Sequence, residues 1–133
     1  MRVSELMQRS LRTISSEATI PEAIDGLVTA HVSALPVLDR FGRAVGVISS
    51  RRILEAERDQ RTAARRDRLF EETRVIEVMQ AWVATIPPDA DVRQAAALML
   101  ESGEPRLFVK DKGALVGVVS LTDVARAFVA VPA

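Results

Sequence analysis

The sequence contains an internal duplication, and this feature constrains the fold more than any other. Residues 3–8 (VSELMQ) recur as residues 75–80 (VIEVMQ), 72 positions further along the chain. The same offset relates residues 13–14 (TI) to residues 85–86 (TI). Repetition at a fixed spacing is typical of a chain that forms one supersecondary unit twice. We therefore predict two similar repeats within the 133 residues.

A charged segment separates the two repeats. Residues 55–74 contain six acidic residues and six arginines, mixed with alanine, leucine and phenylalanine. This composition favours a charged surface helix or a mobile linker, and the balanced charges favour a solvated, salt-bridged face over a nucleic-acid interface. The predicted organisation is a first repeat at 1–54, a linker at 55–74 and a second repeat at 75–133.

Each repeat contains a strand, a hairpin turn, a second strand and then a helix. The pattern covers residues 34–53 (ALPVLDRFGRAVGVISSRRI) in the first repeat and 106–124 (RLFVKDKGALVGVVSLTDV) in the second. Apolar runs on both sides of a turn that contains Asp and Gly predict a β-hairpin. The earlier copy closes with SSRR at 49–52 and the later one with SLTD at 120–123, so any shared chemistry has diverged.

A further helix is predicted before each hairpin. Thr19 and Glu22 have the spacing of a capping box, and Asp91 and Gln94 follow the same logic. Apolar residues then recur with helical spacing, namely Ile20, Ala23, Ile24, Leu27 and Val28 in the first helix and Val92, Ala95, Ala96, Met99 and Leu100 in the second. We expect each helix to pack on its own small sheet, in an α/β (α+β) fold.

The composition excludes several kinds of chemistry. The chain has no cysteine and a single histidine, His31, which excludes disulfides, thiol nucleophiles and cysteine or histidine metal clusters. Basic and acidic residues number 18 each, so no overall field attracts nucleic acid. No stretch has the length and apolarity of a membrane span, and we expect a soluble, cytoplasmic protein without membrane association.

Three short phrases support a family resemblance. They are SALPVLD at 33–39, GVIS at 46–49 and GVVSLTD at 117–123, and the doubled pattern resembles a tandem pair of CBS domains. The resemblance implies two β-α-β-β-α repeats packed about a pseudo-twofold axis, in a chain that commonly pairs with a second copy. It also implies a regulatory role, in which an adenosine-containing ligand binds in a cleft between the repeats and an effector protein responds.

The resemblance also implies which residues contact the ligand. Asp123 would accept hydrogen bonds from the ribose hydroxyls, and the Ser120 and Thr122 hydroxyls at the helix start would attract phosphate. Val118 would form an apolar wall for the base, and Arg106 would face the phosphates. The other implied contacts are Ser10, Arg12, Val32, Ser33 and Ala34 of the first repeat.

Some of these residues have an alternative role. Ser120 and Asp123 also have the spacing of a capping box, which needs no ligand, and the spacing alone supports both roles equally. Arg52 stands at the position of Asp123 in the first repeat and cannot accept a hydrogen bond, so ribose recognition is not expected there. Arg52 and Arg106 either form an anion site or are two surface cations.

Three further residues are better explained by structural roles than by ligand binding. His31 falls at the end of the first helix, where a side chain can satisfy terminal carbonyls. Trp82 could stack on a base, but burial or dimer packing is the better explanation. Asp91 is better explained as a helix cap than as half of a carboxylate pair with Asp89.

These observations favour a non-catalytic ligand-sensing module. No nucleophile with a base and no metal cage is evident, so we expect no enzyme activity and no required cofactor. The candidate ligands are AMP, ADP, ATP and S-adenosylmethionine. The alternatives are a structural or oligomerisation protein with vestigial clefts and, ranked below it, nucleic-acid binding through the Arg-rich linker. We also expect a homodimer, because small residues such as Ala95, Ala96 and Ala97 let helices approach closely.

Overall fold

The structure, a computed structural model, describes residues 1–60, 62–81 and 84–130 and divides the chain into two compact units. Of the described residues, unit 1 contains 1–11 and 84–130, and unit 2 contains 12–60 and 62–81. Each unit has its own three-stranded sheet and its own buried cluster of apolar side chains. The units are therefore described one at a time.

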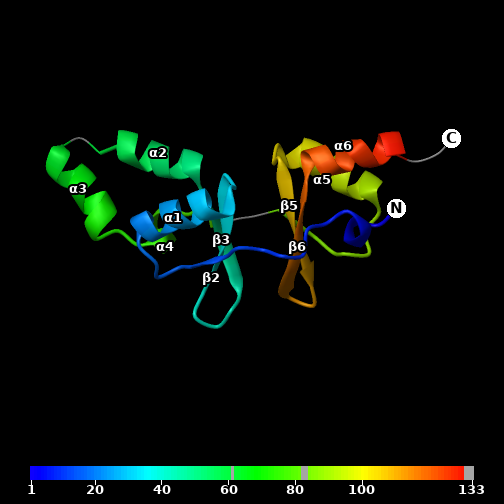
Figure 1. Ribbon diagram of the computed structural model, residues 1–133, viewed down its shortest axis with the longest axis horizontal. Coiled ribbons are helices and arrows are strands. Elements are labelled where there is room, and N and C mark those ends of the chain that lie inside the picture. The colour runs from blue at the N-terminus through cyan, green and yellow to red at the C-terminus, as the bar shows by residue number, and fades with distance from the viewer. Residues whose placement is uncertain (61, 82–83, 131–133) are drawn as a thin grey trace. The chain divides into compact units, whose positions relative to one another are not determined.

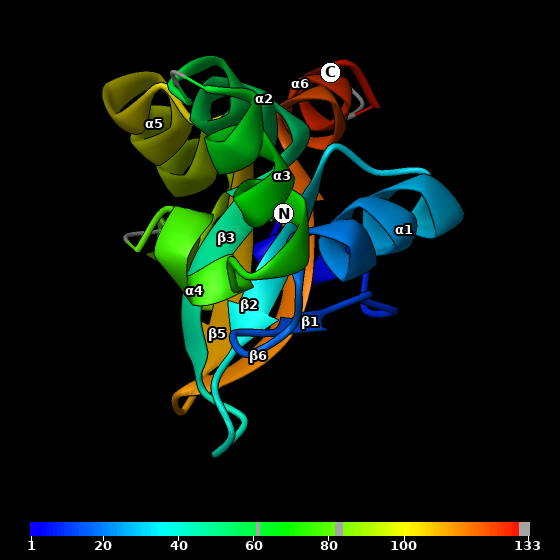
Figure 2. The ribbon, with the colours of Figure 1, turned by 90° about the vertical axis from the view of Figure 1, so that its left-hand side faces the viewer.

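Unit 2 is built around a sheet of order β1-β2-β3, with β1 parallel and β3 antiparallel to the central β2. In chain order its elements are β1 (Ile14–Ser15), α1 (Ile20–Ala30), β2 (Ala34–Leu38), β3 (Ala44–Ser49), α2 (Ser50–Arg58), α3 (Ala63–Glu71) and α4 (Val75–Val78). The first five of these elements follow the predicted order β-α-β-β-α. Figure 2 shows this unit facing the viewer.

Unit 1 repeats the same plan with the sheet order β4-β5-β6. Its elements are the 3-10 helix η1 (Val3–Glu5), β4 (Thr85–Ile86), α5 (Val92–Ser102), β5 (Arg106–Asp111), β6 (Ala114–Ser120) and α6 (Leu121–Ala130). Helices α5 and α6 lie beside each other (Figure 1). The predicted α/β fold class is thus confirmed.

Both predicted capping boxes form at the starts of α1 and α5. The Glu22 N–H donates to Thr19 Oγ1 at 3.2 Å, and the Thr19 N–H donates back to Glu22 Oε1 at 3.4 Å. At α5 the Asp91 N–H donates to Gln94 Oε1 at 2.8 Å, while an Asp91 oxygen accepts from the Arg93 N–H at 3.0 Å. These bonds satisfy N–H groups that a helix start leaves without partners, which fixes where each helix begins.

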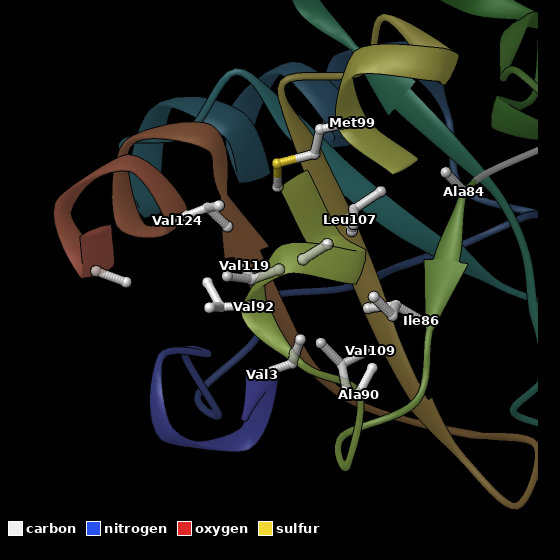
Figure 3. Close-up of a cluster of buried hydrophobic side chains, with 12 residues drawn as sticks. Val3, Ala84, Ile86, Ala90, Val92, Met99, Leu107, Val109, Val119 and Val124 are labelled. Carbon is white, nitrogen blue, oxygen red and sulfur yellow. The ribbon is translucent and has the colours of Figure 1, made fainter. Parts of the chain in front are cut away.

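The helix faces predicted from sequence are only partly buried. In α1, Ile20, Ala23 and Leu27 belong to the core of unit 2, whereas Val28 is 67% exposed. In α5, Leu100 is 81% exposed although Met99 beside it is buried. Figure 3 shows the core of unit 1, in which side chains from η1, α5, β5, β6 and α6 meet. Each helix therefore has one apolar row in the core and a second row at the surface.

The charged segment between the repeats is helical over most of its described length. Helix α2 continues to Arg58, and α3 follows after a short break. Leu69 of α3 is buried in the core of unit 2, so this helix is packed rather than detached. Ion pairs join Arg51 to Glu55 and Arg66 to Glu57 at the surface. Among the described residues, no helix is both long and apolar enough to cross a membrane.

The start of each sequence repeat packs in the unit that holds the other repeat's hairpin. Residues 3–8 belong to unit 1, where Gln8 forms an isolated bridge with Val118 of β6. Residues 75–80 belong to unit 2, where Gln80 forms the equivalent bridge with Val47 of β3. The compact units are therefore divided differently from the predicted sequence repeats.

Candidate functional site

The predicted ligand-binding residues of the second repeat gather where β6 passes into α6. Ser120, the last residue of β6, pairs in register with Arg106, the first residue of β5. The Leu121 N–H donates to the Pro105 carbonyl at 2.8 Å, which holds the helix start against the start of β5. Backbone pairing thus places Arg106 and Ser120 side by side at one end of the hairpin in unit 1.

Ser120 and Asp123 form a capping box at the start of α6. The Asp123 N–H donates to Ser120 Oγ at 3.1 Å, and the Ser120 N–H points back to Asp123 Oδ2 at 3.5 Å. The first bond has ordinary geometry, and the second is at the long limit for a hydrogen bond. The capping role is therefore formed in the structure, whereas a role of Asp123 in ribose binding stays a prediction. Its second oxygen, Oδ1, accepts no hydrogen bond from the residues that the structure describes.

Val118 of β6 forms a bridge with Gln8, and Ser10 lies close to Gln8 in the chain. The Val118 N–H donates to the Gln8 carbonyl at 3.0 Å, and the Gln8 N–H donates to the Val118 carbonyl at 2.8 Å. Ser10 follows Gln8 by two residues and is exposed, and Thr122 is exposed on the first turn of α6. Unit 1 therefore contains Ser10, Arg106, Val118, Ser120, Thr122 and Asp123.

The other four predicted contacts belong to unit 2. Arg12 and Val32 are exposed, and Ala34, the first residue of β2, is buried. The Ser33 carbonyl accepts the Ser50 N–H at 3.0 Å, as the Pro105 carbonyl accepts the Leu121 N–H in unit 1. A ligand-binding role of these four residues stays a prediction.

Arg52 has a structural partner in unit 2. Its Nε donates to the Val78 carbonyl at 2.8 Å, and this bond links α2 to the end of α4. Its backbone N–H donates to Ser49 Oγ at 3.0 Å, so half of the capping arrangement seen at α6 is kept. One N–H group of the Arg52 guanidinium is thus engaged by the protein itself, which leaves fewer donors for an anion.

Two residues expected to have structural roles have them, although one uses different atoms. Asp91 caps α5 as predicted. His31 ends α1 with φ 55°, in the left-handed region, and its backbone N–H bonds to the carbonyls of Leu27 and Val28. The end of α1 is thus closed by the His31 backbone N–H, and a capping role of the His31 side chain stays a prediction. Trp82 lies outside the described residues.

The close approach that sequence reasoning missed involves the two strand glycines. A Cβ atom on Gly46 would lie 2.5 Å from the Gln80 carbonyl oxygen and 2.8 Å from Met79 Sδ. A Cβ atom on Gly117 would lie 2.7 Å from Met7 Sδ and 2.9 Å from the Gln8 oxygen. Real Cβ atoms do not approach so closely, so Gly is required at both positions. The signal was present in the sequence, because Met-Gln and Val-Gly-Val are both duplicated.

No described residues form a metal site of the common kind. Within residues 1–60, 62–81 and 84–130, no three His, Asp or Glu side chains are grouped so that they could hold an ion.

The repeated strand and helix order of the two units agrees with a comparison of the chain with known protein families. The family model for the CBS domain matches the chain twice, over residues 3–59 and 75–130. The chain therefore belongs to the CBS domain family, as its doubled phrases predict. CBS domains are regulatory modules that often bind adenosine-containing ligands.

Curated relatives include short and long proteins. The CBS domain-containing protein YhcV of Bacillus subtilis is 32% identical over 123 residues, which are 92% of this chain and 82% of the relative. An inosine-5'-monophosphate dehydrogenase of Methanocaldococcus jannaschii is 27% identical over 124 residues, but this chain spans only 23% of its length. The match is thus to a part of that enzyme.

Solved structures with the same fold cover almost the whole chain. A CBS domain-containing protein of unknown function from Bacillus anthracis has a TM-score of 0.85 at 21% identity, covering 96% of this chain and 92% of that one, and shows the fold alone. CBSX2, crystallised in complex with AMP, has a TM-score of 0.79 at 26% identity, and the match covers 96% of this chain and 96% of that one.

Proposed function

We propose that the protein is a non-catalytic regulatory module that binds an adenosine-containing ligand at the β6–α6 junction of unit 1. The main support is the Asp123 carboxylate, which caps α6 with Oδ2 and leaves Oδ1 without a described donor. Similarity to CBSX2, a structure with AMP, supports the ligand class.

The side chains at this junction suit the two ends of a nucleotide. A carboxylate oxygen can accept hydrogen bonds from the vicinal ribose hydroxyls. The exposed Thr122 hydroxyl and the Arg106 guanidinium are donors suited to phosphate oxygens. Ser120 Oγ already accepts the Asp123 N–H, but its own hydroxyl hydrogen can still be donated. The proposed ligand is thus AMP, ADP, ATP or S-adenosylmethionine, with no cofactor required.

Binding is proposed to change the response of an effector protein rather than to drive a reaction. The described polar residues of unit 1 offer hydrogen-bond donors and acceptors but no nucleophile activated by a base. A cytoplasmic setting, compatible with a chain that lacks cysteine, is part of the same proposal.

Titration calorimetry with AMP, ADP, ATP and S-adenosylmethionine tests the proposal. Asp123→Asn keeps an oxygen that can cap the helix but removes the charge, so it should weaken binding by about 1 to 3 kcal/mol. Asp91→Asn changes a helix cap of the same unit that is not in the predicted ligand set, and it should bind like the parent protein. Equal affinity of Asp123→Asn and the parent would limit Asp123 to capping.

A thermal-shift screen separates this function from the structural alternative. A ligand present at 100 times its dissociation constant stabilises the folded state by about 2.7 kcal/mol. Absence of a shift with all four ligands would favour an oligomerisation protein with vestigial clefts.

We also propose that the chain forms a homodimer through the second apolar row of its helices. Ile24, Val28 and Leu54 of unit 2 are exposed, as are Leu100 and Val129 of unit 1. Apolar side chains that a monomer exposes to water would be buried when two copies of the chain associate, which favours a dimer. Ala95 cannot contribute, since it is fully buried in unit 1, whereas Ala97 is exposed. A monomeric mass in sedimentation at micromolar concentration would contradict the dimer.

A further inference from the structure

A cavity lies beside α3 in unit 2, where the chain has just left α2. Its volume is about 350 Å³, and its lining residues are Gln60, Arg65, Arg68, Leu69 and Thr73. Pockets for small molecules usually measure roughly 300 to 1,000 Å³, so the space suits a compact organic molecule. None of the lining residues belongs to the set predicted to bind an adenosine ligand.

The two arginines line the cavity from the same side of one helix. Arg65 and Arg68 are three residues apart in α3, a spacing that makes side chains neighbours on the helix surface. Leu69 is buried in the core of unit 2, so it gives the cavity an apolar wall and anchors the helix that presents the arginines.

These two guanidinium groups differ from other arginines of α2 and α3. Arg51 pairs with Glu55 and Arg66 pairs with Glu57, both at 3.4 Å. Neither Arg65 nor Arg68 lies within ion-pair distance of a carboxylate among the described residues, and the cavity lining contains no Asp or Glu. The cavity therefore presents two arginines that form no direct ion pair with a carboxylate of the described residues.

The remaining polar groups also favour an anion. Gln60 Nε2 donates one hydrogen to the Ala56 carbonyl at 3.0 Å and has a second hydrogen to donate. Thr73 Oγ1 donates to the Arg68 carbonyl at 3.3 Å, which ties the end of the segment to α3. The lining thus offers two arginine forks and one amide donor beside an apolar leucine surface.

The geometry points to a second binding site, for a small organic phosphate, in this cavity. The planar guanidinium fork matches phosphate oxygens with two parallel hydrogen bonds, and two forks suit a doubly charged group. The apolar wall at Leu69 suits the organic part of the molecule. A concave site of this volume favours a small molecule over a nucleic-acid backbone. The inference does not rest on the function proposed for unit 1, because all lining residues lie in unit 2.

Nuclear magnetic resonance with inorganic pyrophosphate as the probe tests this site. We expect saturable shifts of the backbone amide signals of Gln60, Leu69 and Thr73. Arg65→Gln and Arg68→Gln should each weaken pyrophosphate binding about tenfold or more, because each removes charge-assisted hydrogen bonds. Arg66→Gln is the matched control, since Arg66 lies in the same helix but pairs with Glu57 outside the lining, and it should leave the affinity within about twofold.

Other outcomes would overturn the site. The inference fails if these three amides do not shift at millimolar pyrophosphate, or if the Arg65→Gln, Arg68→Gln double variant still binds like the parent. It also fails if Arg106→Gln in unit 1, rather than the double variant, abolishes binding. Citrate binding as tightly as pyrophosphate would overturn the assignment to phosphate. Unchanged signals of the unit 2 core residues Ile20, Leu35 and Ile48 in the double variant confirm that this unit is folded.

Discussion

The two units start the helix after the hairpin with the same serine but a different fourth residue. In unit 1, Ser120 Oγ accepts the Asp123 N–H and Asp123 Oδ2 accepts the Ser120 N–H, so the two residues form a capping box at the first turn of α6. In unit 2, Ser49 caps α2 from one side only, and Arg52 donates to the Val78 carbonyl instead. Replacing the acceptor Asp by the donor Arg at this position thus turns a side chain that caps its own helix into one that links α2 to α4. The difference shows how one duplicated backbone can keep a candidate ligand carboxylate in one copy and lose it in the other.

Substitution of the strand glycines should have the largest effect and should differ between units. Gly46→Ala would push a Cβ atom against the Gln80 carbonyl at 2.5 Å, and backbone cannot move aside cheaply. We expect a loss of about 3 kcal/mol in the free energy of unfolding. Gly117→Ala meets the flexible Met7 side chain at 2.7 Å and the Gln8 carbonyl oxygen only at 2.9 Å, so its backbone clash is milder and it should cost about 1 to 2 kcal/mol. Urea denaturation measures both, and equal losses would contradict the asymmetry.

The next effect concerns Arg52 and Asp123. Arg52→Ala removes the bond to the Val78 carbonyl and should destabilise the protein by about 1.5 kcal/mol. Asp123→Ala removes half of a cap and should cost about 1 kcal/mol.

Arg52→Asp sharpens the same comparison, because it restores the carboxylate but not the tie. It should be less stable than the parent in urea denaturation. Stability equal to or above that of the parent would show that the bond to Val78 contributes nothing.

Substitutions at the C-terminal ends of α1 and α5 should change the free energy of unfolding less, and with opposite signs. Gly103 ends α5 at φ 71°, whereas His31 ends α1 at φ 55°, where a side chain is strained. His31→Gly should therefore raise the free energy of unfolding by about 0.5 kcal/mol, and Gly103→Ala should lower it by about 1 kcal/mol. Thermal melts of the two variants check the signs, and a destabilised His31→Gly would mean that the His31 side chain makes a contact worth more than the strain.

The smallest effect is pH-dependent and belongs to the hairpin turn of unit 2. Asp39 accepts hydrogen bonds from the Arg43 and Phe41 N–H groups and from the Arg43 guanidinium. The Arg43 backbone N–H above all lowers the pKa of Asp39 below its ordinary value, and the Arg43 guanidinium and the Phe41 N–H add to this effect against the opposing effect of burial. Because the folded state favours the charged form, Asp39 stabilises the protein above the ordinary Asp pKa, near 3.9, and this contribution is lost as the pH falls through the lowered value.

Asp39→Asn tests this turn. The variant should be less stable than the parent at pH 7, and the difference in melting temperature should shrink in the acid range below the ordinary Asp pKa. A difference that stays constant down to acid pH would contradict a role for the charge.

The local features of this fold could be predicted from sequence because they depend on residues close together in the chain. Thr19 with Glu22 and Asp91 with Gln94 have their partners three positions away, and both boxes form. The pairing of Gln80 with Val47 could not be predicted, since a duplication at equal spacing does not say which copy of a segment packs with which hairpin. The cavity beside α3 was missed for a similar reason. Arg65 and Arg68 were part of a balanced charge run, and only side-chain geometry shows which arginines are left unpaired.

The placement of the short starting segments has a consequence for cutting or permuting the chain. Val3 is fully buried in the cluster of unit 1, and Val75 is fully buried in that of unit 2. A fragment that contains only the first sequence repeat would carry Val3 without the rest of unit 1. It would also lack Val75, so the buried cluster of unit 2 would be incomplete. Neither half is thus an autonomous module that recombination could transplant intact. The smallest fragment that preserves both buried apolar clusters is therefore the complete pair of repeats.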